Sequence, residues 1–91
     1  MTESLTQEDQ LTWARTVYGE ARGEPRAGQL AVAFVPWNRA QISGRSVAAE
    51  CLKPYQFSCW NHDDPNRVRM LALDANDLHA FLAIIDEVLM G

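Results

Sequence analysis

The stretch that decides the fold is Val17-Tyr18-Gly19-Glu20-Ala21-Arg22-Gly23-Glu24-Pro25. Apolar residues recur at helical spacing on both sides of it, which predicts two helices joined by a turn. Gly19 and Gly23 weaken the helix here and permit a turn or a close backbone approach. Glu20 falls at the end of the first helix, where packed helices can hold a carboxyl group that ligands still reach. We therefore interpret Glu20 as a candidate proton donor.

The first helix is predicted to begin after Thr6, a favoured N-cap residue with Asp9 three positions further on. Its apolar face is formed by Leu11, Ala14, Val17, Tyr18 and Ala21. Trp13, Thr16 and Glu20 share the neighbouring face, at offsets of three, four and seven residues. We therefore expect an indole ring on the same side of the helix as Glu20, where it would shield the carboxyl group from water.

The second helix is predicted to begin at Pro25, since proline is favoured at the first helical position. Residues 30–37 are almost entirely apolar, which places this helix at the centre of the core. Pro36 should kink or end it, because proline removes a backbone donor and crowds the preceding turn. Residues 41–45 are predicted to form a loop, with Ser43-Gly44 as the turn signal.

The C-terminal half contains shorter elements. Ser46 is predicted to cap a short helix that runs to Leu52, and residues 55–60 alternate polar and apolar, which favours an extended segment or a short strand. Asp64-Pro65 can begin another short helix. The last helix carries the apolar stripe of residues 78–89 and is expected to be capped by Asn76 or Asp77 and to end at Gly91. The sequence thus predicts one mainly α domain over residues 1–91, with at most a short β segment.

The composition excludes several functional classes. Of the 91 residues, 47% are hydrophobic and 22% charged, which is typical of a globular domain with one modest core. The formal net charge is −4, so we expect neither nucleic acid nor an anionic membrane surface as a partner. No apolar run approaches the length of about 18 residues that a membrane span needs.

Four ordered segments together resemble a known family. They are residues 14–25, residues 28–33, Asn38-Arg39 and residues 56–60. Their order and spacing are similar to those of the SleB/CwlJ-type cell wall hydrolases, which are found in spore germination, in phage and in proteobacteria. The resemblance covers residues 11–90, and four ordered segments are far more specific than the glutamate motif alone.

The resemblance implies a lysozyme-like, helical catalytic domain that acts on peptidoglycan as a glycosidase, endolysin or lytic transglycosylase. It places the catalytic glutamate at Glu20. The site residues expected to bind substrate are Tyr18, Glu24, Arg39, Tyr55, Gln56, Phe57 and Ser58. From the residues alone, Phe57 and Trp60 are more simply core aromatics.

The chain departs from the family pattern at two points. Pro36-Trp37 stands where the family usually has aliphatic residues, and the chain ends at Gly91, whereas family members continue into a further segment near the active site. We therefore treat the chain as C-terminally truncated relative to the family. It is then a fragment, a chain whose groove a partner or a second copy completes, or a non-catalytic wall-binding module of a phage or secretion assembly.

Cleavage of a glycosidic bond by water usually needs two carboxylates, whereas a lytic transglycosylase needs one, because the 6-hydroxyl of the sugar attacks. Glu20 fits the scheme with one glutamate. Glu24 is the second candidate acid, although its place before the second helix is typical of a capping carboxylate. Asp63 and Asp64 are weaker candidates for a second carboxylate. Arg22 and Arg39 are expected either to hold these glutamates or to be plain surface charges.

Two cysteines, Cys51 and Cys59, are too few for a disulfide scaffold. They can form one disulfide if the protein acts in the periplasm, or remain two buried thiols. A zinc site with His62 lacks paired ligands, so we predict no metal and no cofactor. The N-terminus is acidic and has no secretory signal. We therefore expect synthesis in the cytoplasm and action in the periplasm or cell wall, with either a signal that has been removed or another route of export.

Overall fold

The structure, a computed structural model, describes residues 5–54 and 56–91. Its helices are α1 (Gln7–Ala21), α2 (Arg26–Ser43), α3 (Val47–Leu52), α4 (Pro65–Leu71) and α5 (His79–Met90), with a single 3₁₀ turn η1 (Ser58–Trp60). The described part of the chain contains no strand, which confirms the mainly α class. Of the two alternatives for residues 55–60, the described residues 56–60 form no strand: Phe57 is extended, and the chain then turns into η1.

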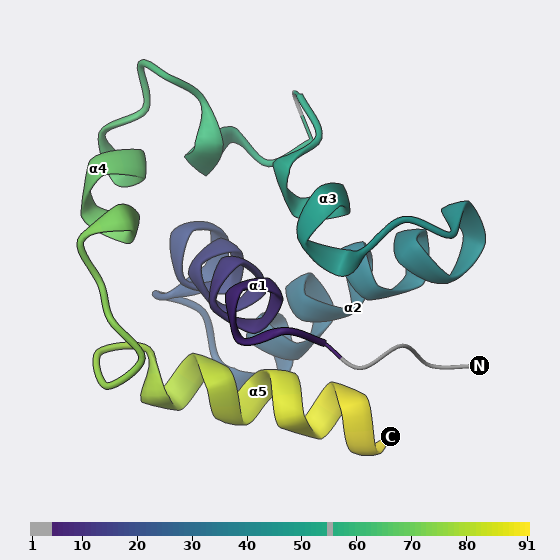
Figure 1. The fold of residues 1–91 in the computed structure, drawn as a ribbon. Coiled ribbons are helices and arrows are strands. Elements are labelled where there is room, and N and C mark those ends of the chain that lie inside the picture. The colour runs from purple at the N-terminus through teal and green to yellow at the C-terminus, as the bar shows by residue number, and fades with distance from the viewer. Residues whose placement is uncertain (1–4, 55) are drawn as a thin grey trace.

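The central helix is α1. Figure 1 shows it in the middle of the molecule with the other helices around it, and it contacts α2, α3, α4, α5 and η1. Six of its side chains are buried: Thr12, Trp13, Ala14, Thr16, Val17 and Ala21. The prediction that the second helix would be central was wrong. The apolar α2 buries only Ala33, Pro36 and Ala40.

Two contacts of Trp13 fasten α2 to α1. The Trp13 indole N–H donates to the Ala33 carbonyl at 3.0 Å, and the rings of Trp13 and Trp37 stack with their centroids 5.6 Å apart. Pro36, which is buried between these contacts, does not end the helix. Because proline removes only one backbone bond, the packing on either side of it carries α2 on to Ser43. The loop predicted from residue 41 therefore begins only at Gly44, the left-handed C-cap with φ 79°.

Three helices have the predicted N-caps. Thr6 and Asp9 form a reciprocal capping box at the start of α1. Ser46 caps α3 by accepting a bond from the Ala49 N–H, and Asp64 caps α4 by accepting one from Asn66. These three signals therefore predicted the helix starts correctly.

The start of α5 differs from the prediction. Its N-cap is Leu78, not Asn76 or Asp77. Asp77 and Asp74 instead accept each other's backbone N–H, at 3.1 and 2.9 Å, and so form a turn ahead of the helix. The predicted end is confirmed, since Gly91 is the C-cap. None of the described helices has both the length and the apolar character to cross a membrane.

The apolar residues form two clusters. The larger lies between α1, α2, α3 and α5 and includes Trp13, Val17 and Ile85. The smaller consists of Phe57, Cys59 and Met70, with Tyr18 and Trp60 packed against it. The smaller cluster brings the segment around η1 against the C-terminal half of α1, which carries the candidate residue Glu20.

Candidate functional site

Glu20 lies in the last turn of α1, and its side chain is exposed. The backbone N–H of Cys59 in η1 donates to Glu20 Oε2 at 3.1 Å, across 39 residues of sequence. A backbone donor to a carboxylate is a charge-assisted bond, which fixes the orientation of the group. Glu20 is thus held in place at the junction of two elements while solvent and ligands can still reach it.

Gly19 makes this arrangement possible. A Cβ atom at this position would lie 2.7 Å from Cys59 Cβ and 2.8 Å from Cys59 Sγ, and it would also overlap Met70 Sδ. Cβ atoms essentially never come this close to heavy atoms of another residue, so η1 can approach α1 in this way only because residue 19 has no side chain. The close approach that the sequence predicted here is confirmed. Gly23, in contrast, has open space around it.

The indole ring expected on the Glu20 side of α1 belongs to a different residue. Trp13 is buried against α2, whereas Trp60 of η1 donates its indole N–H to Thr16 Oγ1 at 2.8 Å. The Thr16 hydroxyl in turn donates to the Thr12 carbonyl at 2.8 Å. The expected shielding of Glu20 from water was wrong, because the indole that was to provide it points into the core and the carboxylate is exposed.

Both cysteines are free and buried, so the structure has no Cys51–Cys59 disulfide. Burial raises the pKa of the Cys59 thiol far above its usual value, and the Glu20 carboxylate beside it raises this pKa further. Burial likewise raises the pKa of Cys51 to about 12, with a smaller upward contribution from Glu50 and an opposing hydrogen bond from Thr16. Both sulfurs are therefore protonated at neutral pH and are not nucleophiles.

Arg22 and Arg39 were expected either to hold the glutamates or to be surface charges; both are exposed, and each stands over an aromatic ring. The Arg22 guanidinium lies 5.0 Å from the centroid of the Tyr18 ring, and that of Arg39 lies 5.9 Å from the Phe57 ring. Among the described residues the only ion pair joins Arg26 and Glu87. Neither arginine therefore neutralises Glu20, and both contacts are of the cation–π type.

Glu24 lies in the turn between α1 and α2 and is exposed. Its Oε1 comes within 3.3 Å of where a Cβ of Gly28 would be, so its side chain covers the first turn of α2. A carboxylate there favours the positive end of the helix. No capping hydrogen bond forms, and Pro25, predicted as the first helical residue, is instead the N-cap, because its ψ of 164° is extended.

A hollow of about 280 Å³ brings some predicted substrate-binding residues together. It is lined by Arg39, Ile42, Ser43, Arg45, Glu50, Lys53 and Gln56, and we call it the basic hollow. Arg39 and Gln56 were predicted site residues, but Glu50 was not. Only 2% of Glu50 is exposed, and it accepts a bond of 2.6 Å from the Ser43 hydroxyl. The spacing of Val47, Glu50 and Cys51, all buried on α3, is the signal that would have found it.

A second hollow, of about 310 Å³, is lined by Glu8, Thr12, Arg15, Leu52, Trp60, Arg67 and Leu71. We call it the Trp60 hollow. Arg15 donates to the Leu73 carbonyl at 2.7 Å, while its Nε is buried without a hydrogen-bond partner in the described part of the chain. Glu20 lines neither of these two hollows, although Trp60 of η1 lines the Trp60 hollow and Gln56, two residues before η1, lines the basic hollow.

The remaining predicted residues have mixed positions. Tyr18 is half-buried and meets Phe81 edge to face at 5.4 Å. Phe57 is buried, as expected of a core aromatic, and Ser58 is exposed. Tyr55 lies outside the described residues. Asp63 is exposed, and Asp64 is engaged as the cap of α4. Within residues 5–54 and 56–91, no three His, Cys, Asp or Glu side chains gather as metal ligands would.

Comparison with known proteins gives one partial similarity. The chain is 47% identical over 47 residues to a protein named "Spore cortex-lytic enzyme" from Bacillus subtilis (strain 168), a match that covers 50% of this chain. It covers 15% of that protein, so the chain spans only a small part of its relative's length. No family model matches, and no solved structure matches. The chain is thus distantly and partly similar to a cortex-lytic hydrolase, and the lysozyme-like form of its helical fold stays a prediction.

Proposed function

We propose that this protein cleaves the glycan strand of peptidoglycan, with Glu20 as both acid and base. The partial similarity to a cortex-lytic enzyme supports the substrate class. The observation that carries the role of Glu20 is its geometry: an exposed carboxylate at a helix end, oriented by the Cys59 N–H. Fixed orientation combined with access is what a general acid needs.

The chemistry uses one carboxyl group twice. The protonated Glu20 gives its proton to the glycosidic oxygen as the bond from that oxygen to the sugar carbon breaks. The 6-hydroxyl of the same sugar then attacks that carbon and loses its proton to Glu20, which restores the acid and leaves an anhydro ring. A second carboxylate is needed only if water attacks instead. Asp64 is committed to capping α4, so of the two aspartates considered as a second carboxylate only the exposed Asp63 stays available for that route.

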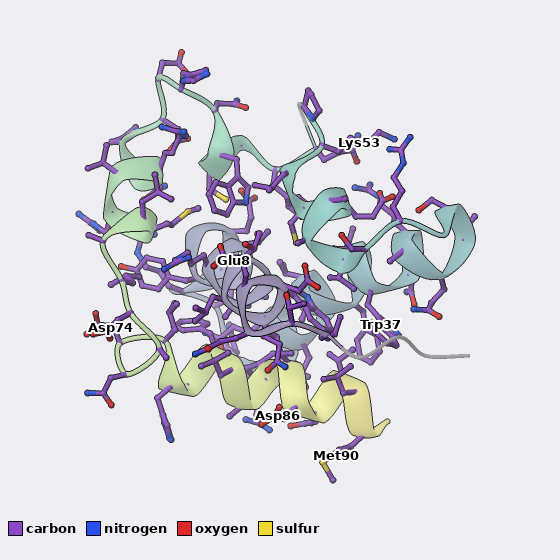
Figure 2. The ribbon with its side chains drawn as sticks, in the orientation of Figure 1. Glu8, Trp37, Lys53, Asp74, Asp86 and Met90 are labelled. Carbon is purple, nitrogen blue, oxygen red and sulfur yellow. The ribbon has the colours of Figure 1, made fainter. Side chains whose placement is uncertain are left out.

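The test is turnover of purified sacculi by the 91-residue chain, with the products identified by mass spectrometry. Glu20→Gln should lower the rate about 100-fold or more, the typical contribution of a general acid. Asp86→Asn is the matched control: Asp86 is exposed on α5, on the opposite side of the view from Lys53 (Figure 2). Full activity of the Glu20→Gln variant would refute the assignment, and Glu24→Gln tests the second candidate acid.

The products decide between the remaining chemistries. Anhydromuramic ends indicate transglycosylation, reducing ends indicate hydrolysis of the glycan, and free peptide stems indicate amide cleavage. Binding to insoluble sacculi without any product would favour a non-catalytic wall-binding module instead. We propose the cell wall or periplasm as the place of action. Since the similar protein is bacterial, we do not propose a phage source.

A further inference from the structure

The basic hollow concentrates cations in an acidic protein. Arg39, Arg45 and Lys53 are three of the eight Lys and Arg residues of a chain with a net charge of −4. They come from α2, from the turn after it and from the C-cap of α3, and all three are exposed. Within the described residues none of them forms an ion pair. These charges give the hollow a local field opposite in sign to that of the whole protein.

Buried bonds fix the shape of the hollow. The Ser43 hydroxyl donates to the buried Glu50 carboxylate, and its oxygen also accepts the Arg45 N–H at 3.1 Å. One hydroxyl thus ties the end of α2 to α3 and sets the path of the backbone on which Arg45 stands. The lining contains three cationic side chains and one carboxylate, Glu50, so its formal net charge is +2.

The other side of the hollow continues toward Glu20. The Gln56 N–H donates to the Lys53 carbonyl at 3.2 Å, which forms a turn, and Phe57 follows under the guanidinium of Arg39. Two residues later Cys59 donates to Glu20. A ligand held by Arg39, Lys53 and Gln56 would therefore contact the same segment that orients the candidate acid.

We propose that the basic hollow binds a carboxylate of the acidic peptide stems joined to the glycan strand. Guanidinium, ammonium and amide N–H groups together provide the charge-assisted bonds that a carboxylate accepts. The inference rests on the proposed function, because it takes peptidoglycan as the substrate. It adds a second contact that sets which glycosidic bond along the strand lies against Glu20. The lactyl carboxylate of muramic acid offers the same chemistry without a peptide, so the test separates the two.

The first experiment uses an acidic tripeptide with three carboxylates as the probe, titrated into the labelled protein and followed by NMR. Saturable shifts are expected at the residues of the basic hollow. The variant Arg45→Gln/Lys53→Gln should bind about tenfold more weakly, since two charge-assisted bonds are lost at exposed positions. The control Arg26→Gln/Arg69→Gln removes the same charge elsewhere and should bind as the parent does. Equal weakening in the two double variants, or no binding by the parent, overturns the proposal.

The second variant changes affinity in the opposite direction. Glu50→Gln keeps the acceptor for Ser43 but raises the net charge of the lining from +2 to +3, so binding should tighten about threefold at low salt. Added salt should reduce this gain, because exposed charges are screened. Weaker binding by a folded Glu50→Gln variant would overturn the proposed electrostatics.

The third experiment distinguishes the source of the carboxylate and separates this inference from the proposed function. Intact sacculi and glycan strands stripped of peptide are compared as sedimenting ligands. A deficit of Arg45→Gln/Lys53→Gln on intact sacculi alone supports the peptide stem, and an equal deficit on stripped strands overturns it in favour of the lactyl group. If Glu20→Gln keeps full turnover while the hollow variant still loses tripeptide binding, the proposed function fails and the binding site stands. If the hollow variant binds normally while Glu20→Gln is inactive, the reverse holds.

Discussion

Glu20 and Glu50 each lie on a helix beside a cysteine, but they differ in solvent exposure and in the group that donates a hydrogen bond to them. Each lies on a helix close to a buried thiol, Cys59 for Glu20 and Cys51 for Glu50. Glu20 is exposed and accepts a backbone N–H from 39 residues away. Glu50 is buried and accepts a hydroxyl from seven residues away. The difference indicates that Glu50 serves the shape of the fold, whereas the orientation of Glu20 depends on how η1 packs against α1.

The largest stability effect is expected from Gly19→Ala, which attacks the support of Glu20. The new methyl group would overlap Cys59 Cβ, so η1 must move away from α1 and the Cys59 N–H must leave Glu20. Overpacking of this kind costs up to about 3 kcal/mol, and the better helix propensity of alanine returns about 1 kcal/mol. We expect the free energy of unfolding in urea to fall by about 2 kcal/mol, together with a loss of turnover.

Gly23→Ala is the matched control for this variant. No atom lies within 4 Å of the place that a Cβ at residue 23 would take, and the backbone there is not left-handed. The free energy of unfolding of Gly23→Ala should therefore stay within about 0.5 kcal/mol of the parent. If Gly19→Ala and Gly23→Ala were equally stable and equally active, the contact between η1 and α1 would not be what holds Glu20.

The next largest loss of stability is expected when Glu50 loses its hydrogen-bond donor, Ser43. Ser43→Ala leaves the buried carboxylate without its hydroxyl donor and also removes the acceptor of the Arg45 N–H. An unsatisfied buried acceptor costs about 1–3 kcal/mol, so we expect a loss of about 2 kcal/mol in urea unfolding without a direct effect on the contact at Glu20. Ser58→Ala, at an exposed serine, should change stability by less than about 0.5 kcal/mol. Equal effects of the two substitutions would show that Glu50 does not depend on Ser43.

The thiol beside Glu50 predicts a pH dependence of stability. The pKa of Cys51 is about 12 in the folded protein against a usual value of 9.0. The folded state therefore holds this proton more tightly, so the stabilisation is complete below pH 9 and is lost as the pH rises toward 12. Between about pH 9 and pH 10 the free energy of unfolding should fall by about 1 kcal/mol through this group. In Cys51→Ala the decline should be flatter by that amount, and an unchanged slope would contradict the burial of a thiol there.

The sequence predicted those features that depend on neighbouring residues. Thr6, Ser46 and Asp64 lie beside the N–H groups that they cap, so their helix starts followed from the local sequence. The position of η1 did not follow, because it depends on a contact between Gly19 and Cys59, which are far apart in the sequence. The exposure of Phe34 and Val35, 38% and 37%, was also missed. Composition shows that a helix is apolar but not which neighbours cover it.

In the candidate site, too, the sequence predicted what a local motif determines and missed what depends on tertiary contacts. Glu20 was found because it lies in a motif that resembles a family, and its exposure and its Cys59 donor became visible only in the fold. Glu50 has no such motif, and its neighbours Ser43 and Arg39 are contributed by α2. A buried carboxylate next to cations is a tertiary feature, which residue spacing on one six-residue helix can only hint at.

The smallest expected loss of stability tests whether Thr16 couples the region around Glu20 to the region around Glu50. Its hydroxyl accepts the Trp60 indole N–H on the Glu20 side and donates to the Thr12 carbonyl, and it also lowers the pKa of the Cys51 thiol on the Glu50 side. Trp60→Phe removes the first bond and should cost about 1 kcal/mol in urea unfolding. Thr16→Val removes both, so the double variant should show a coupling of about 0.5–1 kcal/mol between positions 16 and 60. Additive losses would mean that η1 is held on α1 by Gly19 and the small apolar cluster alone, and that the regions of Glu20 and Glu50 respond to substitution independently.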